Sequence, residues 1–258
     1  MEVHTHSHTE RKKWTHYFWE FFMLFLAVTL GFLVENQREH YMEHKREVEY
    51  IRTMVEDLKE DTGSFNRLIQ INLVANEKID TLIALLKGKE RNNFVKKIYY
   101  MARTIPLLDQ DLVLQNKTFE QLKGSGGLRL IRNTQTQNKI GAYYQNNKFI
   151  ESGFGPMQFQ NRRDLFMEFD ELFDAGTMQE IMRSPGQMPT TIPDNQFKLL
   201  SDDPKTINSF CTRYHIMYST KRVTSNQAKN LINEATELIK YLEEEYHLSG
   251  DQRTLLDK

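Results

Sequence analysis

Apolar residues are most concentrated near the N-terminus, where residues 17–34 read YFWEFFMLFLAVTLGFLV. These 18 residues contain one charged side chain, that of Glu20. As an α-helix with a rise of about 1.5 Å per residue, the segment would span about 27 Å, close to the hydrocarbon thickness of a bilayer. A helix that is apolar on every side is unusual at the edge of a soluble domain. The pattern therefore predicts one transmembrane helix at residues 17–34.

A cleaved signal peptide is the alternative explanation for this segment. Signal peptides have shorter apolar regions, of roughly 7–15 residues, and end in a small-x-small cleavage site. Here the apolar run continues into Leu33-Val34-Glu35-Asn36-Gln37, which offers no such site. We therefore expect the segment to be retained as an anchor, with the lipid bilayer as its partner.

The flanks of the predicted span indicate its orientation. Trp14, Tyr17 and Trp19 gather at the N-terminal edge, where amphipathic rings favour the headgroup level. Three basic residues at 11–13 precede the span, whereas residues 35–39 after it hold one arginine and two glutamates. Basic residues beside a span favour the cytoplasmic side, so we expect a cytoplasmic N-terminus. Further lysines and arginines follow the span, so the total number of basic residues on each side does not decide the orientation.

This orientation divides the chain into four expected parts. Residues 1–16 form a short polar tail in the cytoplasm, and residues 17–34 cross the membrane. Residues 35–248 form an extracytoplasmic helical bundle, and residues 249–258 form a C-terminal tail.

Apolar residues recur at helical spacing after the span. With a heptad that begins at Val48, nine of the twelve a and d positions up to Leu86 are apolar. Apolar residues at the g position widen the stripe beyond that of a two-stranded coiled coil, which favours a helix packed in a bundle. We predict one long helix from the membrane to about Lys87, with a bend at Gly63 left open.

A second heptad pattern covers residues 204–248. Asp203 followed by Pro204 is a helix start, an N-cap with proline at the first helical position. Ser249-Gly250 supplies a stop. The sequence thus predicts a second long helix that can run against the first.

Shorter elements are expected between the two long helices. Helices are predicted at residues 94–104, at 118–123 and from Asn133 or Thr134 to about residue 150. Gly153-Phe154-Gly155-Pro156 should kink or break the chain before a further helix at residues 162–173. Residues 184–203 hold three prolines and are the expected exposed loop. The fold class is therefore all-α, with the transmembrane helix continuing into a long-helix bundle with coiled-coil-like packing.

The composition of the chain argues against a nucleic-acid partner and against an intrachain disulfide. The net charge is −1, with many charges of both signs, so we expect no nucleic-acid partner. Cys211 is the single cysteine, so no intrachain disulfide can form, and its helical face predicts a buried thiol.

Two histidine motifs raise the possibility of metal binding. His40, Glu43 and His44 match H-x-x-E-H, in which two histidines one turn apart could hold zinc beside a glutamate base. Several glutamates surround the motif on a charged helix, so solvated charge pairs are the favoured interpretation. His4, His6 and His8 alternate and could bind a metal weakly, but a polar tail is the favoured interpretation. We expect no cofactor.

Ala27 and Gly31 form a small-xxx-small pair within the predicted span. Such pairs let two transmembrane helices approach closely, so a homo-oligomer is a possible state of the protein.

Several segments resemble a known family: YFWEFFMLFLAVTLGFLVENQREH, EYIRTMVEDLKEDT, TFEQLKGSGGLRLIRN and IGAYY. They are similar to a functionally uncharacterised family of single-pass, membrane-anchored helical proteins common in Bacteroidota. The resemblance covers most of residues 12–144. It implies a protein of the bacterial inner membrane whose extracytoplasmic helical domain lies in the periplasm, and it carries no catalytic residues.

Three classes of function follow. We favour a non-catalytic scaffold or interaction module of the bacterial envelope, acting on an envelope protein partner. The alternative is an extracytoplasmic bundle that senses a ligand and acts through a partner. The third is a metal-dependent hydrolase that uses His40 and His44.

Overall fold

The computed structural model describes residues 14–109, 113–183 and 197–248, without the side chains of residues 147–154 and 182. The described residues form helices and no strand, which confirms the predicted all-α class. The chain divides into two compact units, Met1–Tyr50 and Ile51–Lys258. Helix α1 (Trp14–Lys87) contributes residues to both, and each unit is described by itself.

Helix α1 is a single helix of 74 residues, as the periodicity predicts. It passes through Gly63 without a break. A Cβ atom at that position would have the Arg67 guanidinium as its nearest neighbour, at 3.8 Å. The cost of one helical glycine, about 1 kcal/mol relative to alanine, is small beside the packing of a helix this long.

The second unit holds the remaining elements. In chain order they are η1 (Arg91–Phe94), α2 (Val95–Thr104), η2 (Ile105–Leu108), α3 (Lys117–Gly124), η3 (Gly127–Leu130), α4 (Thr134–Phe166), α5 (Phe169–Leu172), α6 (Ala175–Arg183) and α7 (Pro204–Glu245). The predicted caps are present, because Asn133 Oδ1 accepts from the amide of Gln135 and Asp203 Oδ2 accepts from the amide of Thr206. Helix α6 was not predicted, and α7 ends three residues before the predicted position.

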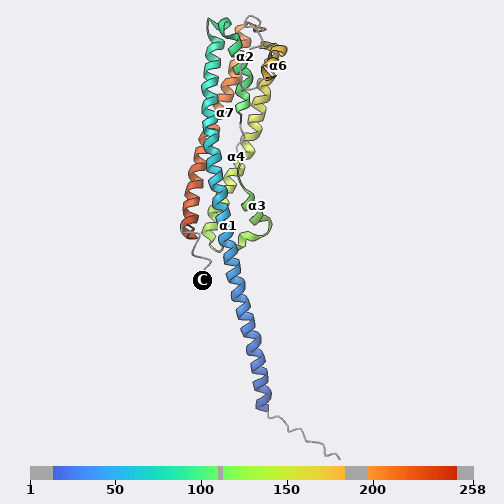
Figure 1. Ribbon diagram of the computed structural model, residues 1–258, viewed down its shortest axis with the longest axis vertical. Coiled ribbons are helices and arrows are strands. Elements are labelled where there is room, and N and C mark those ends of the chain that lie inside the picture. The colour runs from blue at the N-terminus through green and yellow to red at the C-terminus, as the bar shows by residue number, and fades with distance from the viewer. Residues whose placement is uncertain (1–13, 110–112, 184–196, 249–258) are drawn as a thin grey trace, which may run out of the picture. The chain divides into compact units, whose positions relative to one another are not determined.

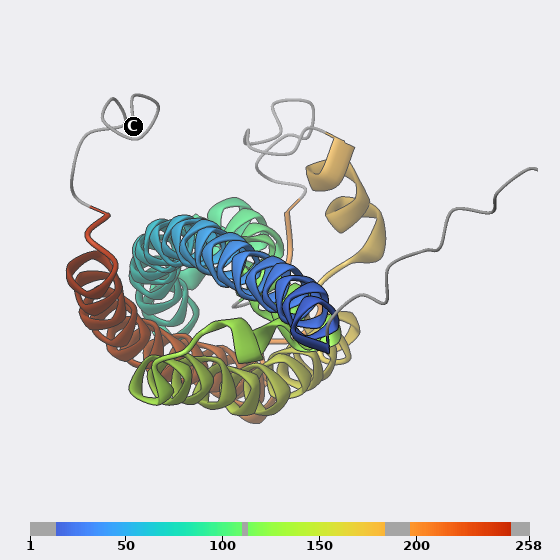
Figure 2. The same ribbon diagram turned by 90° about the horizontal axis from the view of Figure 1, so that it is seen from below.

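Within the second unit, α7 runs antiparallel to α1 and to α4 (Figures 1 and 2). Lys59 of α1 pairs with Glu243 near the end of α7 at 2.7 Å. Farther along α1, Asn72 hydrogen-bonds to Ser225 at 3.1 Å. On the other flank, Thr136 at the start of α4 meets Tyr241 at 3.0 Å. The long helices thus form the bundle that the two heptad patterns predict.

The buried face of α1 is rotated relative to the predicted a and d seam. All six d positions between Ile51 and Leu86 are buried, as are the g residues Met54 and Leu82. Most a positions, such as Ile69 and Ile83, are only half-buried. The buried residues of α1 therefore lie mainly at the d and g positions, which alternate at spacings of three and four residues. This is the side on which α1 packs against its neighbours.

Of the kink or break predicted at Gly153–Pro156, the break is absent, since α4 is one helix with Pro156 inside it. Contacts with α7 on both sides of the proline hold the helix together, including the hydrogen bond from Gln158 to Thr224 at 3.2 Å. The helix predicted at residues 162–173 is confirmed in part, since residues 162–166 end α4 and Phe169–Leu172 form α5. The two are separated by a turn at Met167, which is 72% exposed.

A hydrophobic cluster fills the end of the second unit where α2, α5 and α6 meet the start of α7. It includes Tyr99, Phe173, Phe210 and the buried Cys211. Burial raises the pKa of the Cys211 thiol, consistent with the predicted structural role. Phe197, at the described end of the predicted exposed loop, is also buried in this cluster. Residues 184–196 of that loop lie outside the described residues.

Candidate functional site

The predicted metal motif lies on one face of α1. His40 Nδ1 is 3.8 Å from Glu43, three residues on, and His44 Nδ1 is 3.3 Å from Glu47. Both imidazoles are more than half exposed. Within the described ranges, no three His, Cys, Asp or Glu side chains are grouped so that they could hold a metal. His4, His6 and His8 lie outside those ranges.

The residues predicted at the membrane are exposed on the first unit. Trp14, Tyr17 and Trp19 are 80%, 57% and 58% exposed. Ala27 is also exposed, and a Cβ atom built on Gly31 would meet open space. The apolar stretch contains an 18-residue window none of which is buried, so the helix is long and apolar enough to cross a membrane. His16 pairs with Glu20 at 3.0 Å near its start.

Polar residues interrupt the apolar interior of the second unit at one level. Asn72 on α1 and the pair Lys221 and Thr224 on α7 occupy seam positions where apolar residues flank them on both sides. Gln158, Asn161 and Arg162 of α4 and Asp109, which follows η2, approach the same level. We call these seven residues the polar layer.

Lys221 carries the charge at the centre of the polar layer. Its side chain is 2% exposed, and Nζ lies 2.8 Å from Asp109 Oδ1, whose side chain is 8% exposed. The same ammonium donates to the carbonyl of Leu108 and to Asn72 Oδ1, each at 3.4 Å. Arg162 approaches the second oxygen of Asp109 at 3.7 Å. A lysine buried this deeply requires such partners, so the arrangement ties α1, α4, α7 and the end of η2 together.

Asp61 is a further buried polar residue of α1. It is 0% exposed and accepts hydrogen bonds from the amide of Gln115 at 2.7 Å and from the Tyr143 hydroxyl at 3.2 Å. Burial raises the pKa of Asp61 to about 6, while these two hydrogen bonds act in the opposite direction. One carboxyl thus joins α1 to α4 and to the segment before α3.

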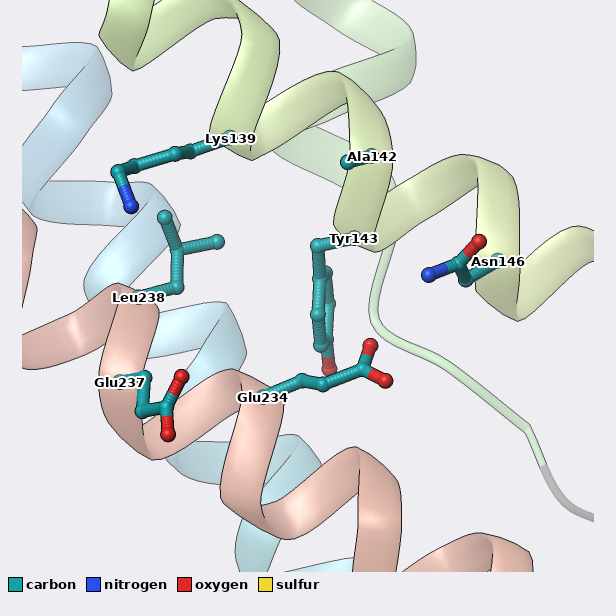
Figure 3. A pocket seen from close by; sticks show the side chains of 7 residues that line it. All are labelled: Lys139, Ala142, Tyr143, Asn146, Glu234, Glu237 and Leu238. Atoms are coloured by element: carbon teal, nitrogen blue, oxygen red, sulfur yellow. The ribbon is translucent and has the colours of Figure 1, made fainter.

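Tyr143 also faces a hollow of about 240 Å³ between α4 and α7 (Figure 3). We call it the α4–α7 groove. Figure 3 shows the Tyr143 ring extending from α4 toward α7. The lining residues are Lys139, Ala142, Tyr143, Asn146, Glu234, Glu237 and Leu238. A cavity lined by charged and apolar groups next to a buried carboxyl is the feature best suited to bind something.

Neither feature was singled out from the sequence, although a signal existed for the polar layer. The heptad pattern of α7 skips Lys221 and Thr224, which are polar at positions where apolar residues precede and follow. In the same way, Asp61 and Asn72 interrupt the seam of α1. The groove gave no such signal, because its lining comes from two helices about 90 residues apart in the chain.

Comparison of the chain with protein-family models, with curated proteins and with solved structures found no match.

Proposed function

We propose that this protein is a single-pass, membrane-anchored interaction module of the bacterial envelope, with its helical bundle on the periplasmic side. The observation that supports it most is the unburied apolar stretch at the start of α1. Such a stretch is unfavourable in water and favourable in a bilayer, where each backbone polar group is already satisfied within the helix.

The second unit favours contact with a partner over bond-making chemistry. Its buried charged groups are engaged by other segments of the bundle. Lys221 pairs with Asp109. Asp61 accepts hydrogen bonds from Gln115 and Tyr143. This is the use expected of groups that fix the packing of a bundle. The surface that such a bundle presents is then stable enough to be recognised by a partner.

Sensing of a ligand is the second candidate, and the α4–α7 groove is the observation that favours it. Clefts between the helices of bundles are common ligand sites. In this case the bundle would transmit the binding of a ligand in the groove to a partner protein in the membrane.

The anchoring is tested by sedimentation of the full chain after cell lysis. We expect the wild type in the membrane fraction, released by detergent but not by high salt or alkaline carbonate. The double variant Leu24→Lys and Val28→Lys should shift into the supernatant, because each lysine near the middle of a span costs about 2.5–3.5 kcal/mol. Leu73→Lys is the matched control, since Leu73 is also an exposed residue of α1, at 54% exposure. Wild-type protein that remains soluble without proteolysis would contradict the proposal.

The interaction is tested separately by crosslinking in native membranes. A photoreactive residue at position 139, an exposed residue of the groove lining, should capture a reproducible envelope protein. A residue at the exposed position 244 should not.

A further inference from the structure

Two carboxylates and one ammonium group line the α4–α7 groove, and the carboxylates are not ion-paired among the described residues. Glu234 and Glu237 lie one turn apart on α7, and both are exposed. Neither makes a hydrogen bond or an ion pair with any part of the chain that the structure describes. Lys139, the basic residue of the lining, places its Nζ over the Tyr241 ring, 4.9 Å from the centroid. With two glutamates and one lysine, the lining keeps a net charge of −1, and the lysine makes no close pair with either carboxylate.

The inner wall of the groove adds a hydrogen-bond acceptor. Tyr143 is 3% exposed, and its hydroxyl donates to Asp61, which is 0% exposed. A phenol has one hydroxyl hydrogen, so the Tyr143 oxygen can act toward other groups only as an acceptor. The side-chain amide of Asn146 also lines the groove. A ligand that fits these walls must bring positive charge and several N–H donors.

The size and shape of the groove select among cations. Its volume of about 240 Å³ lies below the roughly 300–1,000 Å³ of pockets that hold drug-sized ligands, so a single side chain fits better than a large molecule. Ala142 and Leu238 give apolar walls suited to an alkyl stem. The guanidinium group has five N–H donors in one plane and pairs with carboxylates through two parallel hydrogen bonds. A bare metal ion is not favoured, because no set of three ligands gathers in the described residues.

We propose that the α4–α7 groove binds the guanidinium group of an arginine side chain presented by a partner protein. The inference rests on the proposed interaction role and names the chemistry that the partner must bring. Glu234 and Glu237 pair with the guanidinium, Tyr143 accepts from it, and Ala142 leaves room for its stem.

The test is a titration of the full chain, purified in detergent, with the tripeptide acetyl-Gly-Arg-Gly-amide. The matched probe replaces arginine by citrulline, which has nearly the same shape but no charge. We expect the arginine peptide to bind at least about tenfold more tightly, since hydrogen bonds to charged groups contribute about 1.5–3 kcal/mol. Free L-arginine distinguishes a peptide-borne side chain from a free amino acid. It should bind more weakly than the peptide, because Glu234 and Glu237 repel its carboxylate.

Variants at exposed positions separate binding from folding. The double variant Glu234→Gln and Glu237→Gln should weaken binding of the arginine peptide about tenfold or more and remove the difference from citrulline. Ala142→Phe should block binding by filling the hollow while leaving every charge in place. Glu244→Gln is the control, since Glu244 is also an exposed glutamate of α7 and lies outside the groove.

Equal binding of the arginine and citrulline peptides would overturn the proposal. Wild-type affinity in the double glutamine variant, or no binding of either peptide by the wild type, would do the same. Free arginine that binds as tightly as the peptide would point to a small ligand and overturn the assignment to a partner protein. Sedimentation tests anchoring without any arginine probe, so failure of this inference is distinguishable from failure of the proposed membrane anchoring.

Discussion

Asn72 of α1 and Lys221 of α7 contact each other twice. Asn72 Nδ2 donates to the backbone carbonyl of Lys221, and the Lys221 ammonium donates to Asn72 Oδ1, each at 3.4 Å. The two residues are 3% and 1% exposed. Sliding α7 along α1 by one turn would break both contacts and place Lys221 against apolar residues. The pair therefore fixes the register of the two longest helices, as a buried polar residue does in a coiled coil.

The first prediction concerns the ion pair in the polar layer. Lys221→Met keeps an unbranched side chain of similar length but leaves the Asp109 carboxylate buried, with Arg162 at 3.7 Å as its remaining cation. We expect a loss of about 3 kcal/mol in the free energy of unfolding, the usual cost of breaking a buried pair. Urea unfolding of the full chain in detergent, followed by circular dichroism, measures it.

Adding Asp109→Asn to Lys221→Met should recover part of that loss, because no unpaired carboxylate is then buried. Lys229→Met is the control, since Lys229 is an exposed lysine of the same helix and should change stability by less than about 0.5 kcal/mol. Equal losses of unfolding free energy for the substitutions at 221 and 229 would show that the buried pair stabilises the fold no more than an exposed lysine does.

The second prediction concerns Asp61 and pH. Its pKa in the folded protein is about 6, above its ordinary value of 3.8. Between these two values the folded protein binds more protons at this site than the unfolded chain. The contribution of Asp61 is therefore most favourable below about pH 4, and stability is lost as pH rises toward 6. A difference of about two pKa units corresponds to about 3 kcal/mol.

Asp61→Asn should remove this contribution, since an amide does not titrate in this range. We expect the stability difference between variant and wild type to shift in favour of the variant by about 2.4 kcal/mol from pH 4 to pH 7. Unfolding curves at four pH values measure that difference. Asp80→Asn replaces an exposed aspartate of α1 and should give a flat difference. A flat profile for Asp61→Asn as well would refute the raised pKa.

The sequence was informative about elements whose formation depends on local pattern. The apolar run, the heptads and the caps at Asn133 and Asp203 identify the long helices, because periodicity and capping act within a few residues. The heptad pattern alone does not show which side of α1 is most deeply buried. The neighbours that bury Ile51 and Met54 come from distant segments of the chain. The Lys221–Asp109 pair and the α4–α7 groove depend on such distant contacts as well. A polar residue at a buried heptad position indicates a buried polar site, but the sequence does not identify the residue that it contacts.

The third prediction concerns Tyr99, which joins α2 to two distant segments. Its hydroxyl donates to the carbonyl of Lys198 at 2.7 Å and accepts from the amide of Asp174 at 2.9 Å. Tyr99→Phe keeps the ring but leaves both backbone groups without this partner, so we expect a loss of about 1–3 kcal/mol. Tyr100→Phe is the neighbouring control at a half-buried position, and it should have a smaller effect on the unfolding free energy.

The fourth prediction concerns the middle of α4, where the expected break is missing. Pro156 lies inside the helix and is exposed, and its ring removes one backbone hydrogen bond. Gly155, its neighbour, has open space where a Cβ atom would be placed. Pro156→Ala should therefore stabilise the bundle by restoring the hydrogen bond, by up to about 3 kcal/mol, and Gly155→Ala by about 0.5–1 kcal/mol.

Thermal unfolding of the two single variants and of the double variant measures these effects. If Gly155→Ala stabilises while Pro156→Ala destabilises, the packing of α4 on α7 requires the bend that proline imposes. That outcome would contradict the interpretation that α7 holds α4 together in spite of Pro156. Stabilisation by both would instead show that the contacts of Gln158 with Thr224 and of Asn161 with Thr220 persist in a regular helix.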